Sequence, residues 1–314
     1  MSISAGRLRG RYRGAMLGTL VGDALGAKFE GRLIVERAAV DAWLSAVEPL
    51  RFTDDTQMTV GMADSLLACQ GFDGAHMANT FKLDFRHEPW RGYGPGPPQI
   101  FDMLDRGVPW DEAAASMFGG SGSFGNGSAM RVVPAALFAH PDLEAVAALA
   151  RQSSIVTHTH ELGVEGAVLQ AVAVSQLLDE PDGPALDVAR FLERLAGTLA
   201  SPAYQSKLAD IHELLPDADA SAVVRRLGNG VAAQSSVPTA LYAFVRSPDS
   251  FVETVCYAIS LGGDTDTIAA MAGALAGAYL GGQSIPEPLL GRAEAADDLR
   301  ELADDLFELA AART

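Results

Sequence analysis

The chain has 314 residues, of which 48% are hydrophobic and 20% are charged, and its net charge is −17. This is a globular composition with enough apolar material for one large domain or two modest ones. The acidic excess argues against a nucleic-acid partner, because phosphate backbones are bound by Lys and Arg. Solubility is the simplest meaning of the charge.

Cys69 and Cys256 lie far apart in apolar surroundings, and the sequence has no CxxC or Cys/His cluster. A thiolate-bound zinc ion is therefore not expected. Buried free thiols suit a reducing compartment, and the first residues do not resemble a signal peptide. The longest apolar run, 268–280, is shorter than the roughly 20 residues that a membrane span needs. We expect a cytoplasmic protein with no membrane partner.

Apolar residues recur with helical spacing along most of the chain, and the alternation typical of strands is scarce. Breakers occur at 89–98, 118–128, 179–184 and 281–288. We expect one compact all-α domain spanning residues 1–314. In chain order, the predicted helices are 7–26, 55–70, 75–86, 98–106, 111–118, 128–139, 142–153, 161–179, 185–199, 204–214, 219–226, 238–245, 248–260, 266–281 and 290–312.

Two of these helices carry a small residue at every fourth position. The rows are Gly14, Gly18, Gly22 and Gly26 near the start of the chain, and Ala269, Gly273, Gly277 and Gly281 near its end. A helical Gly costs about 0.5–1 kcal/mol relative to Ala, so each row needs a reason. Small residues on one row let two helices approach closely. Each row could pack on some other helix, but we favour packing of the two near one another.

Two acids occur at the end of the first glycine-rich helix, in the segment GDALGAKFEG at residues 22–31. Asp23 lies among small residues within the helix, where a buried carboxylate usually accepts hydrogen bonds from neighbouring groups, so we assign it a structural role. Glu30 follows Phe29 just beyond the helix, near a turn expected at Gly31. Glu30 therefore stands out as a fifth acid beside the two acidic stretches considered below.

The stretch FTDDTQMT begins the helix predicted at 55–70. Thr53 is a good N-cap residue, and Asp54 and Asp55 fall in the first helical turn. Acids at a helix N-terminus complement the helix dipole by about 0.3–1 kcal/mol. Capping alone would explain this segment.

A second acidic stretch, LGGDTDTIAAMAG at 261–273, precedes the other small-residue helix. Asp264 or Thr265 can cap it, and Asp266 falls in its first turn. Capping does not require two such acid-rich segments in one chain. If they meet, their carboxylates would repel unless a cation neutralised them. Oxygen ligands suit Mg²⁺, Mn²⁺ or Ca²⁺, and their number suffices for two ions about 3.5–4 Å apart.

The segment FGGSGSFGNGSAMR at 118–131 is rich in Gly ahead of a predicted helix. Unhindered backbone N–H groups there could bind a phosphate or pyrophosphate, although a flexible connection is equally consistent. The Walker A lysine is missing, and no strand precedes the loop. Arg131 could balance charge or pair with the acids. In VTHTHELG, the spacing of His158 and His160 favours capping or substrate contact over zinc binding.

The sequence resembles the ADP-ribosylglycohydrolase family along nearly its whole length. The motifs that carry the resemblance are GDALGAKFEG, FTDDTQMT, RGYGPG, GSFGNGSAMRVVP, THTHELGVEGAVLQA, SVPTALYAF and LGGDTDTIAAMAGALAGAYLG. The resemblance implies an all-α fold with two Mg²⁺ ions, or Mn²⁺, at the base of a cleft. The implied metal ligands are Thr53, Asp54, Asp55, Asp264, Asp266 and Thr267.

The same resemblance implies the substrate contacts. Ser123, Phe124, Gly125 and Asn126 would border the diphosphate and ribose, His158 would contact the nucleotide, Tyr93 would line the cleft, and Phe118 would approach the adenine. The reaction implied is hydrolysis of the glycosidic bond at ribose C1″ of ADP-ribosylated side chains, with Glu30 or Asp55 as general base. The FE pair before position 31 and the RGYG loop look more like the serine-type branch than the arginine-type branch.

Two alternatives stay open at this stage. The same metal site could hydrolyse a phosphoester or pyrophosphate, or the chain could be a non-catalytic ADP-ribose-binding protein. The complete acidic set argues against the second. The expected partner is an ADP-ribosylated protein or conjugate, with nucleic acid unlikely except as a modified end. A monomer is expected, because the acidic C-terminal helix most simply packs on its own core.

Overall fold

The computed structural model describes residues 3–181, 185–215 and 219–313. Within these ranges the protein is all-α, as predicted, with isolated β-bridges but no strand. The helices are α1 (Ala5–Gly26), η1 (Ala27–Phe29), α2 (Arg37–Leu44), α3 (Asp54–Cys69), α4 (Gly74–His87), α5 (Gly96–Asp105), α6 (Trp110–Ala113), η2 (Met117–Gly120), α7 (Gly127–Met130), α8 (Val133–Ala139), α9 (Leu143–Ser154), α10 (Glu161–Leu178), α11 (Val188–Ala196), α12 (Pro202–Leu214), α13 (Ala220–Leu227), α14 (Ala233–Arg246), α15 (Phe251–Ser260), α16 (Thr265–Leu280), η3 (Gly282–Ser284), α17 (Glu287–Leu290) and α18 (Ala296–Ala311).

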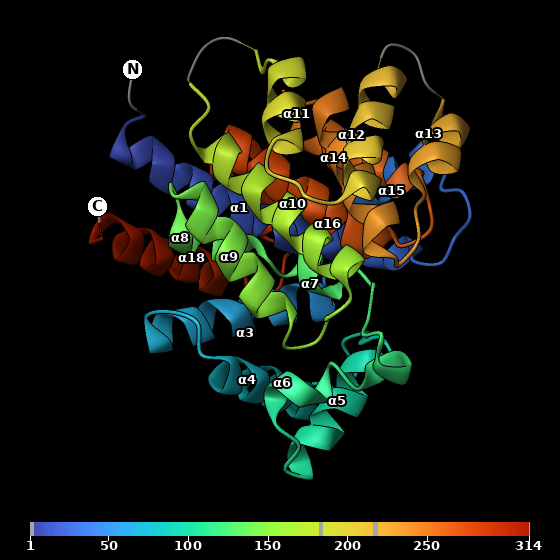
Figure 1. The fold of residues 1–314 in the computed structure, drawn as a ribbon. Helices are drawn as coiled ribbons and strands as arrows, with labels where there is room; N and C mark the ends of the chain where they lie inside the picture. Colours follow the sequence, from blue (N-terminus) through green and yellow to red (C-terminus); the bar gives the residue numbers. More distant parts are fainter. Residues whose placement is uncertain (1–2, 182–184, 216–218, 314) are drawn as a thin grey trace.

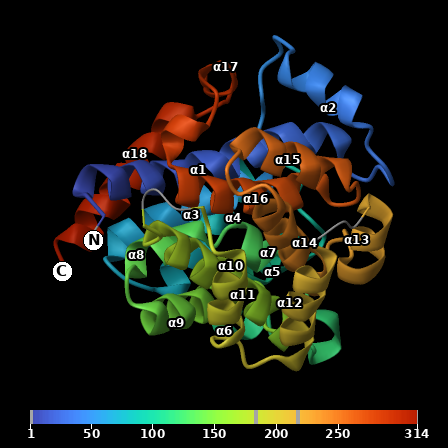
Figure 2. The ribbon, with the colours of Figure 1, turned by 90° about the horizontal axis from the view of Figure 1, so that it is seen from above.

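The two small-residue helices, α1 and α16, pack directly against each other in the middle of the molecule (Figures 1 and 2). Their rows meet in antiparallel order. A Cβ atom added to Gly18 would lie 2.1 Å from the carbonyl oxygen of Gly273, and one added to Gly22 would lie 2.1 Å from that of Ala269. No side chain fits between the two backbones. The prediction that the rows pack on one another is confirmed.

Other helices cover this central pair. Helices α10, α14 and α15 pack on α16, and α18 packs on α1. In Figure 1, α4, α5 and α6 lie together at the foot of the molecule, with α3 between them and the central pair. Among the described residues, one helix, α10, is long and apolar enough to cross a membrane, but 83% of it is buried inside the fold. That burial is typical of a core helix.

Several predicted helices are divided at backbone features that periodicity does not reveal. The helix predicted at 111–118 is the short α6 followed by η2, and η2 is itself interrupted by left-handed φ values of 52° at Phe118 and 69° at Gly119. The one predicted at 128–139 is α7 and α8, since Pro134 begins a new helix rather than continuing one. The helix predicted at 290–312 begins later than predicted, as α18 at Ala296, directly after Ala295 with its left-handed φ of 59°.

Four of the described helices were absent from the prediction, namely α2, η1, η3 and α17. Helix α2 is exposed along most of its length and buries only Val40. The predicted break at 179–184 lies only partly within the described residues, because 182–184 fall outside them.

Candidate active site

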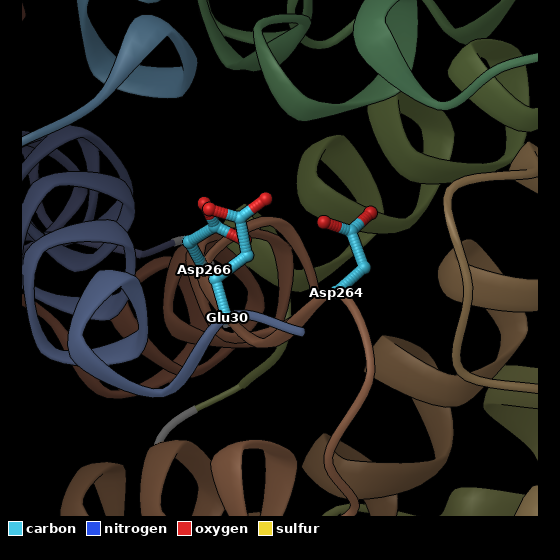
Figure 3. Close-up of side chains that lie close together, drawn as sticks. All are labelled: Glu30, Asp264 and Asp266. Carbon is cyan, nitrogen blue, oxygen red and sulfur yellow. The ribbon is translucent and has the colours of Figure 1, made fainter. Parts of the chain in front are cut away.

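The antiparallel packing of α1 and α16 brings three acids together at one end of the central pair. Glu30 follows η1 directly, Asp264 is the residue before α16, and Asp266 lies in its first turn. Ligand oxygens of all three lie within 4.8 Å of one another. Figure 3 shows their carboxylates directed to the same side of the start of α16. The geometry is that of a candidate metal centre.

Backbone hydrogen bonds fix this junction. The amide of Gly31 donates to the carbonyl oxygen of Gly263 at 2.9 Å, and the amide of Gly263 donates to that of Arg32 at 2.7 Å. Gly263 has φ 77°, and a Cβ there would lie 2.0 Å from the carbonyl oxygen of Asn229. The glycines that lead into DTDT are therefore needed for both conformation and space.

Asp264 occupies the N-cap position of α16, but its side chain makes no capping hydrogen bond. Instead, its Oδ2 accepts from Nδ2 of Asn126 at 2.5 Å. The backbone amide of Asp264 donates to the carbonyl oxygen of Asn229 at 2.8 Å. Capping therefore does not account for this acid, and its carboxylate is turned toward the glycine-rich loop.

The other acidic stretch arrives at the start of α3. Thr53 is its N-cap, as predicted, and its Oγ1 accepts from the amide of Asp55 at 3.3 Å. Oγ1 of Thr267 on α16 donates to Oδ2 of Asp55 at 3.4 Å. Asp54, Asp55, Asp264, Asp266 and Thr267 line one cleft together with Glu30. The two stretches therefore meet, as the sequence predicted.

The acids are held in an electrostatically unfavourable state. Burial raises the pKa of Asp54 to about 8 and that of Asp266 to about 9, and neighbouring carboxylates raise both further. Burial and the charge of Asp264 raise the pKa of Glu30. Oδ1 of Asp55 is buried without a hydrogen-bond partner among the described residues. An all-oxygen cluster with an unpartnered carboxylate oxygen is a chemical fit for hard divalent cations.

The cleft has a volume of about 390 Å³. Its acidic end is formed by α3, α16 and Glu30, and its apolar part includes Met58, Ile100, Met117 and Met130. Exposed aromatic rings lie at its rim, since Phe118 is 58% and Phe124 is 53% exposed. Such a cleft can hold a flat apolar group at one end and a polar group against the acids at the other.

The glycine-rich loop lies along this cleft. Among the predicted substrate contacts, the cleft-lining residues are Phe118, Ser123, Phe124, Gly125, Asn126 and His158. The loop is held by the segment before α14, because the amide of Asn126 donates to the carbonyl oxygen of Val231 at 2.9 Å. A Cβ at Gly127 would lie 2.8 Å from the ring of His158. The loop is thus an ordered wall and not a loose connection.

The two histidines have separate positions. His160 is the N-cap of α10, and its Nδ1 accepts from the amide of Leu162 at 3.1 Å. His158 lines the cleft, and its Nδ1 lies 2.7 Å from Oγ1 of Thr157. Burial and the nearby Arg131 lower the pKa of His158 to about 3, so its ring is neutral. The predicted capping role is confirmed for His160, and substrate contact by His158 stays a prediction.

The structure corrects the prediction that Tyr93 lines the cleft. Its ring packs edge-on against Phe85 and Phe101, and its hydroxyl donates to Oε1 of Gln57 at 2.7 Å. The neighbouring Gly92 and Gly94 line the cleft instead. An aromatic ring gains more by burial in this cluster than at an exposed rim.

Arg131 does not pair with the acids in the structure. Its guanidinium donates to the carbonyl oxygens of Gly127 at 3.2 Å and Ser153 at 3.1 Å, and it stacks over Phe81. Sequence reasoning also missed Asn229 and Val231. The only signal for them was a second Gly-Asn-Gly, residues 228–230, ahead of α14.

Comparisons with known proteins identify the family of this chain. A family model described as ADP-ribosylglycohydrolase matches residues 4–314. The chain is 38% identical to the ADP-ribosylhydrolase ARH3 of Homo sapiens over 327 residues, covering 91% of this chain and 90% of that protein. It is 36% identical over 262 residues to an uncharacterized protein of Archaeoglobus fulgidus, covering 82% and 80% of the two chains. A solved structure, an ADP-ribosylglycohydrolase-related protein complex, matches with a TM-score of 0.72 and 28% identity over 97% of this chain and 99% of that one.

The chain therefore belongs to the ADP-ribosylglycohydrolase family, and it is a hydrolase. Most of the predicted site residues line its acidic cleft. The exceptions are Thr53 and Tyr93, which are not among the lining residues.

Proposed function

We propose that the protein is a divalent-metal-dependent hydrolase that cleaves the glycosidic bond at ribose C1″ of ADP-ribosylated side chains or related conjugates. The observation that carries the proposal is the meeting of acids from three distant segments, Glu30, 54–55 and 264–266, in one cleft. The exposed aromatic rings at the rim of the same cleft are suited to stacking against a nucleotide base.

Two Mg²⁺ ions, or Mn²⁺ ions, would be held by oxygen atoms of the two acidic stretches. The proposed ligands are Thr53, Asp54, Asp55, Asp264, Asp266 and Thr267. When bound, the cations would neutralise the carboxylates, polarise the ribose hydroxyls and lower the pKa of water. The unpartnered Oδ1 of Asp55 and the short distances among Glu30, Asp264 and Asp266 support this assignment.

The reaction would be a hydrolysis in which water adds across the glycosidic bond. The bond from C1″ to the side-chain oxygen breaks with oxocarbenium character on the ribose, and a water oxygen bonds to C1″. Glu30 or Asp55 would accept the proton of the attacking water. The leaving oxygen gains a proton, so ADP-ribose and the unmodified side chain are released.

The other cleft residues would orient the substrate. Ser123, Phe124, Gly125 and Asn126 would border the diphosphate and ribose. His158, whose neutral ring faces the cleft, would contact the nucleotide, and Phe118 would lie against the adenine. We further propose that the chain acts in the cytoplasm as a single, monomeric catalytic domain.

We favour a serine linkage because the FE pair at 29–30 and the RGYG loop resemble the serine-type branch of the family. The test is a comparison of initial rates on matched serine-linked, arginine-linked and O-acetyl ADP-ribose substrates in the presence of Mg²⁺. The serine-linked peptide should turn over fastest. Faster release from the arginine-linked peptide would contradict the linkage, and no release of ADP-ribose from any substrate would contradict the function.

A further inference from the structure

A fully buried acid outside the cleft contacts the start of α3, next to the proposed ligands Asp54 and Asp55. Asp23 is in α1, and its side chain has no exposure to solvent. Its carboxylate accepts hydrogen bonds from the backbone amide and hydroxyl of Thr53 and from the backbone amide and hydroxyl of Thr56. The shortest is from Oγ1 of Thr56 at 2.6 Å. The N-cap residue and the third residue of α3 are thereby fixed to α1.

This arrangement caps α3 from another helix. Thr53 is the N-cap and Thr56 is the third residue of α3, so their amides are among those left without intrahelical partners. The start of a helix carries partial positive charge, which favours a carboxylate there. Most carboxylates in that position come from the same helix. Asp23 instead belongs to α1, which packs against α16. It therefore connects the acidic stretch at the start of α3 to the helix that holds the acidic stretch of α16 in place.

We propose that Asp23 is a positioning residue for the cation site, because it holds Thr53 and the first turn of α3 where Asp54 and Asp55 face the start of α16. This inference rests on the metal assignment in the proposed function. Asp23 itself does not line the cleft. Its effect passes through Thr53, whose hydroxyl donates to Oδ1 of Asp23 at 2.8 Å and lies 3.1 Å from Oδ2 of Asp55.

The chemistry of the four partner groups demands a carboxylate. All four are donors, and a carboxylate has two acceptor oxygens with capacity for all of them. Asparagine has the same shape, but its amide nitrogen would face N–H or O–H donors and leave some of them unsatisfied. Asp23→Asn therefore changes the hydrogen bonding without opening a cavity.

The experiment measures Mn²⁺ affinity by calorimetry on wild-type protein and on Asp23→Asn, with circular dichroism and the metal-free Tm as checks of folding. Thr19→Val is the matched control, because Thr19 is a buried residue one turn earlier in α1 that donates only to the carbonyl oxygen of Ala15. We expect Asp23→Asn to bind Mn²⁺ about 10–100-fold more weakly, as is usual for partners of metal ligands, and Thr19→Val to bind normally. Equal affinity in folded Asp23→Asn would overturn the inference while leaving the proposed function intact.

A second variant keeps the test decisive if Asp23→Asn does not fold. Thr56→Val removes only the shortest of the hydrogen bonds to Asp23, and Thr56 is not a proposed ligand. Weaker Mn²⁺ binding by folded Thr56→Val supports the inference, and unchanged binding contradicts it. If wild-type protein binds no Mn²⁺, both the metal assignment and this inference fail.

Discussion

Oγ1 of Thr265 donates a hydrogen bond to the carbonyl oxygen of Gly26 at 2.9 Å, which joins the start of α16 to the end of α1. The side chain thus satisfies a carbonyl at the C-terminus of one helix from the first turn of the other. Because the helices run antiparallel, this contact places Asp264 and Asp266 beside the chain that leads to Glu30. The position of the candidate metal centre therefore depends on how these two backbones pack.

The close packing of α1 on α16 predicts a position-dependent effect of adding one methyl group. Gly18→Ala would place a Cβ 2.1 Å from a backbone oxygen of α16, so the helices must separate. We expect the free energy of unfolding to fall by about 1–3 kcal/mol, measured by urea denaturation. Gly6→Ala in the same helix is the control, since nothing lies within 4 Å of its added Cβ. Equal stabilities of the two variants would contradict the packing.

Loss of one proposed ligand should remove both metal binding and turnover. Asp266→Ala deletes an acid from the cluster with Glu30 and Asp264. We expect kcat to fall at least about 100-fold. Mutating a residue that only hydrogen-bonds to a metal ligand typically costs about 10–100-fold, and loss of the ligand itself should cost more. The Mg²⁺-dependent rise in Tm should also vanish. Asp298→Asn, an exposed acid on α18, should behave like wild type. Full activity of Asp266→Ala would refute the ligand assignment.

The hydrogen bond from Asn126 to Asp264 predicts that the glycine-rich loop supports the metal centre as well as the substrate. Asn126→Ala removes the donor at 2.5 Å from Oδ2 of Asp264. We expect Mn²⁺ affinity to decrease about 10–100-fold. Ser236→Ala removes only the other partner of that amide, at 3.0 Å, and should have a smaller effect. Calorimetric titration with Mn²⁺ measures the affinity of both variants. A larger loss of affinity in Ser236→Ala than in Asn126→Ala would contradict this prediction.

The raised pKa values predict how metal stabilisation depends on pH. In metal-free protein, Asp54 and Asp266 have folded-state pKa values of about 8 and about 9. The unfolded value of Asp is about 3.9, so the folded state binds these protons more tightly and loses stability as pH rises above the unfolded value. Cations require the deprotonated carboxylates and relieve their repulsion.

The increase in Tm on adding Mg²⁺ should therefore be small at about pH 5 and large at about pH 8, because protons compete with the metal for the same oxygens. Differential scanning fluorimetry with Mg²⁺ or EDTA across this range measures the increment. An increment that is constant or that shrinks with rising pH would show that these carboxylates do not hold the cation.

The sequence predicted the central packing and the meeting of the acids because each left a local signal. A Gly at every fourth position of a helix is costly, so rows at 14–26 and 269–281 indicated close contact between backbones. Each of two helix starts carries a pair of acids, at 54–55 and at 264 and 266, whereas capping a helix needs only one such residue. Asp23 was correctly assigned a hydrogen-bonding role, since a buried acid among small residues has few other outcomes.

Other features depend on contacts that no local pattern encodes. Tyr93 does not line the cleft because its ring packs against Phe85 of α4 and Phe101 of α5. Phe118, inside η2, has a left-handed conformation that favours Gly or Asn, and no local pattern predicts it for an aromatic residue. The carbonyl oxygen of Asn229 accepts a hydrogen bond from the amide of Asp264, a contact between residues distant in sequence. The sequence around Asn229 resembles that of an ordinary turn.

The most direct test of the account is product analysis of a serine-linked ADP-ribosyl peptide by mass spectrometry, with Mg²⁺ or with EDTA. Glycosidic hydrolysis at this acidic cluster predicts ADP-ribose and a peptide that regains its unmodified serine, with both products lost in EDTA. Release of AMP, with a ribose phosphate left on the peptide, would contradict it.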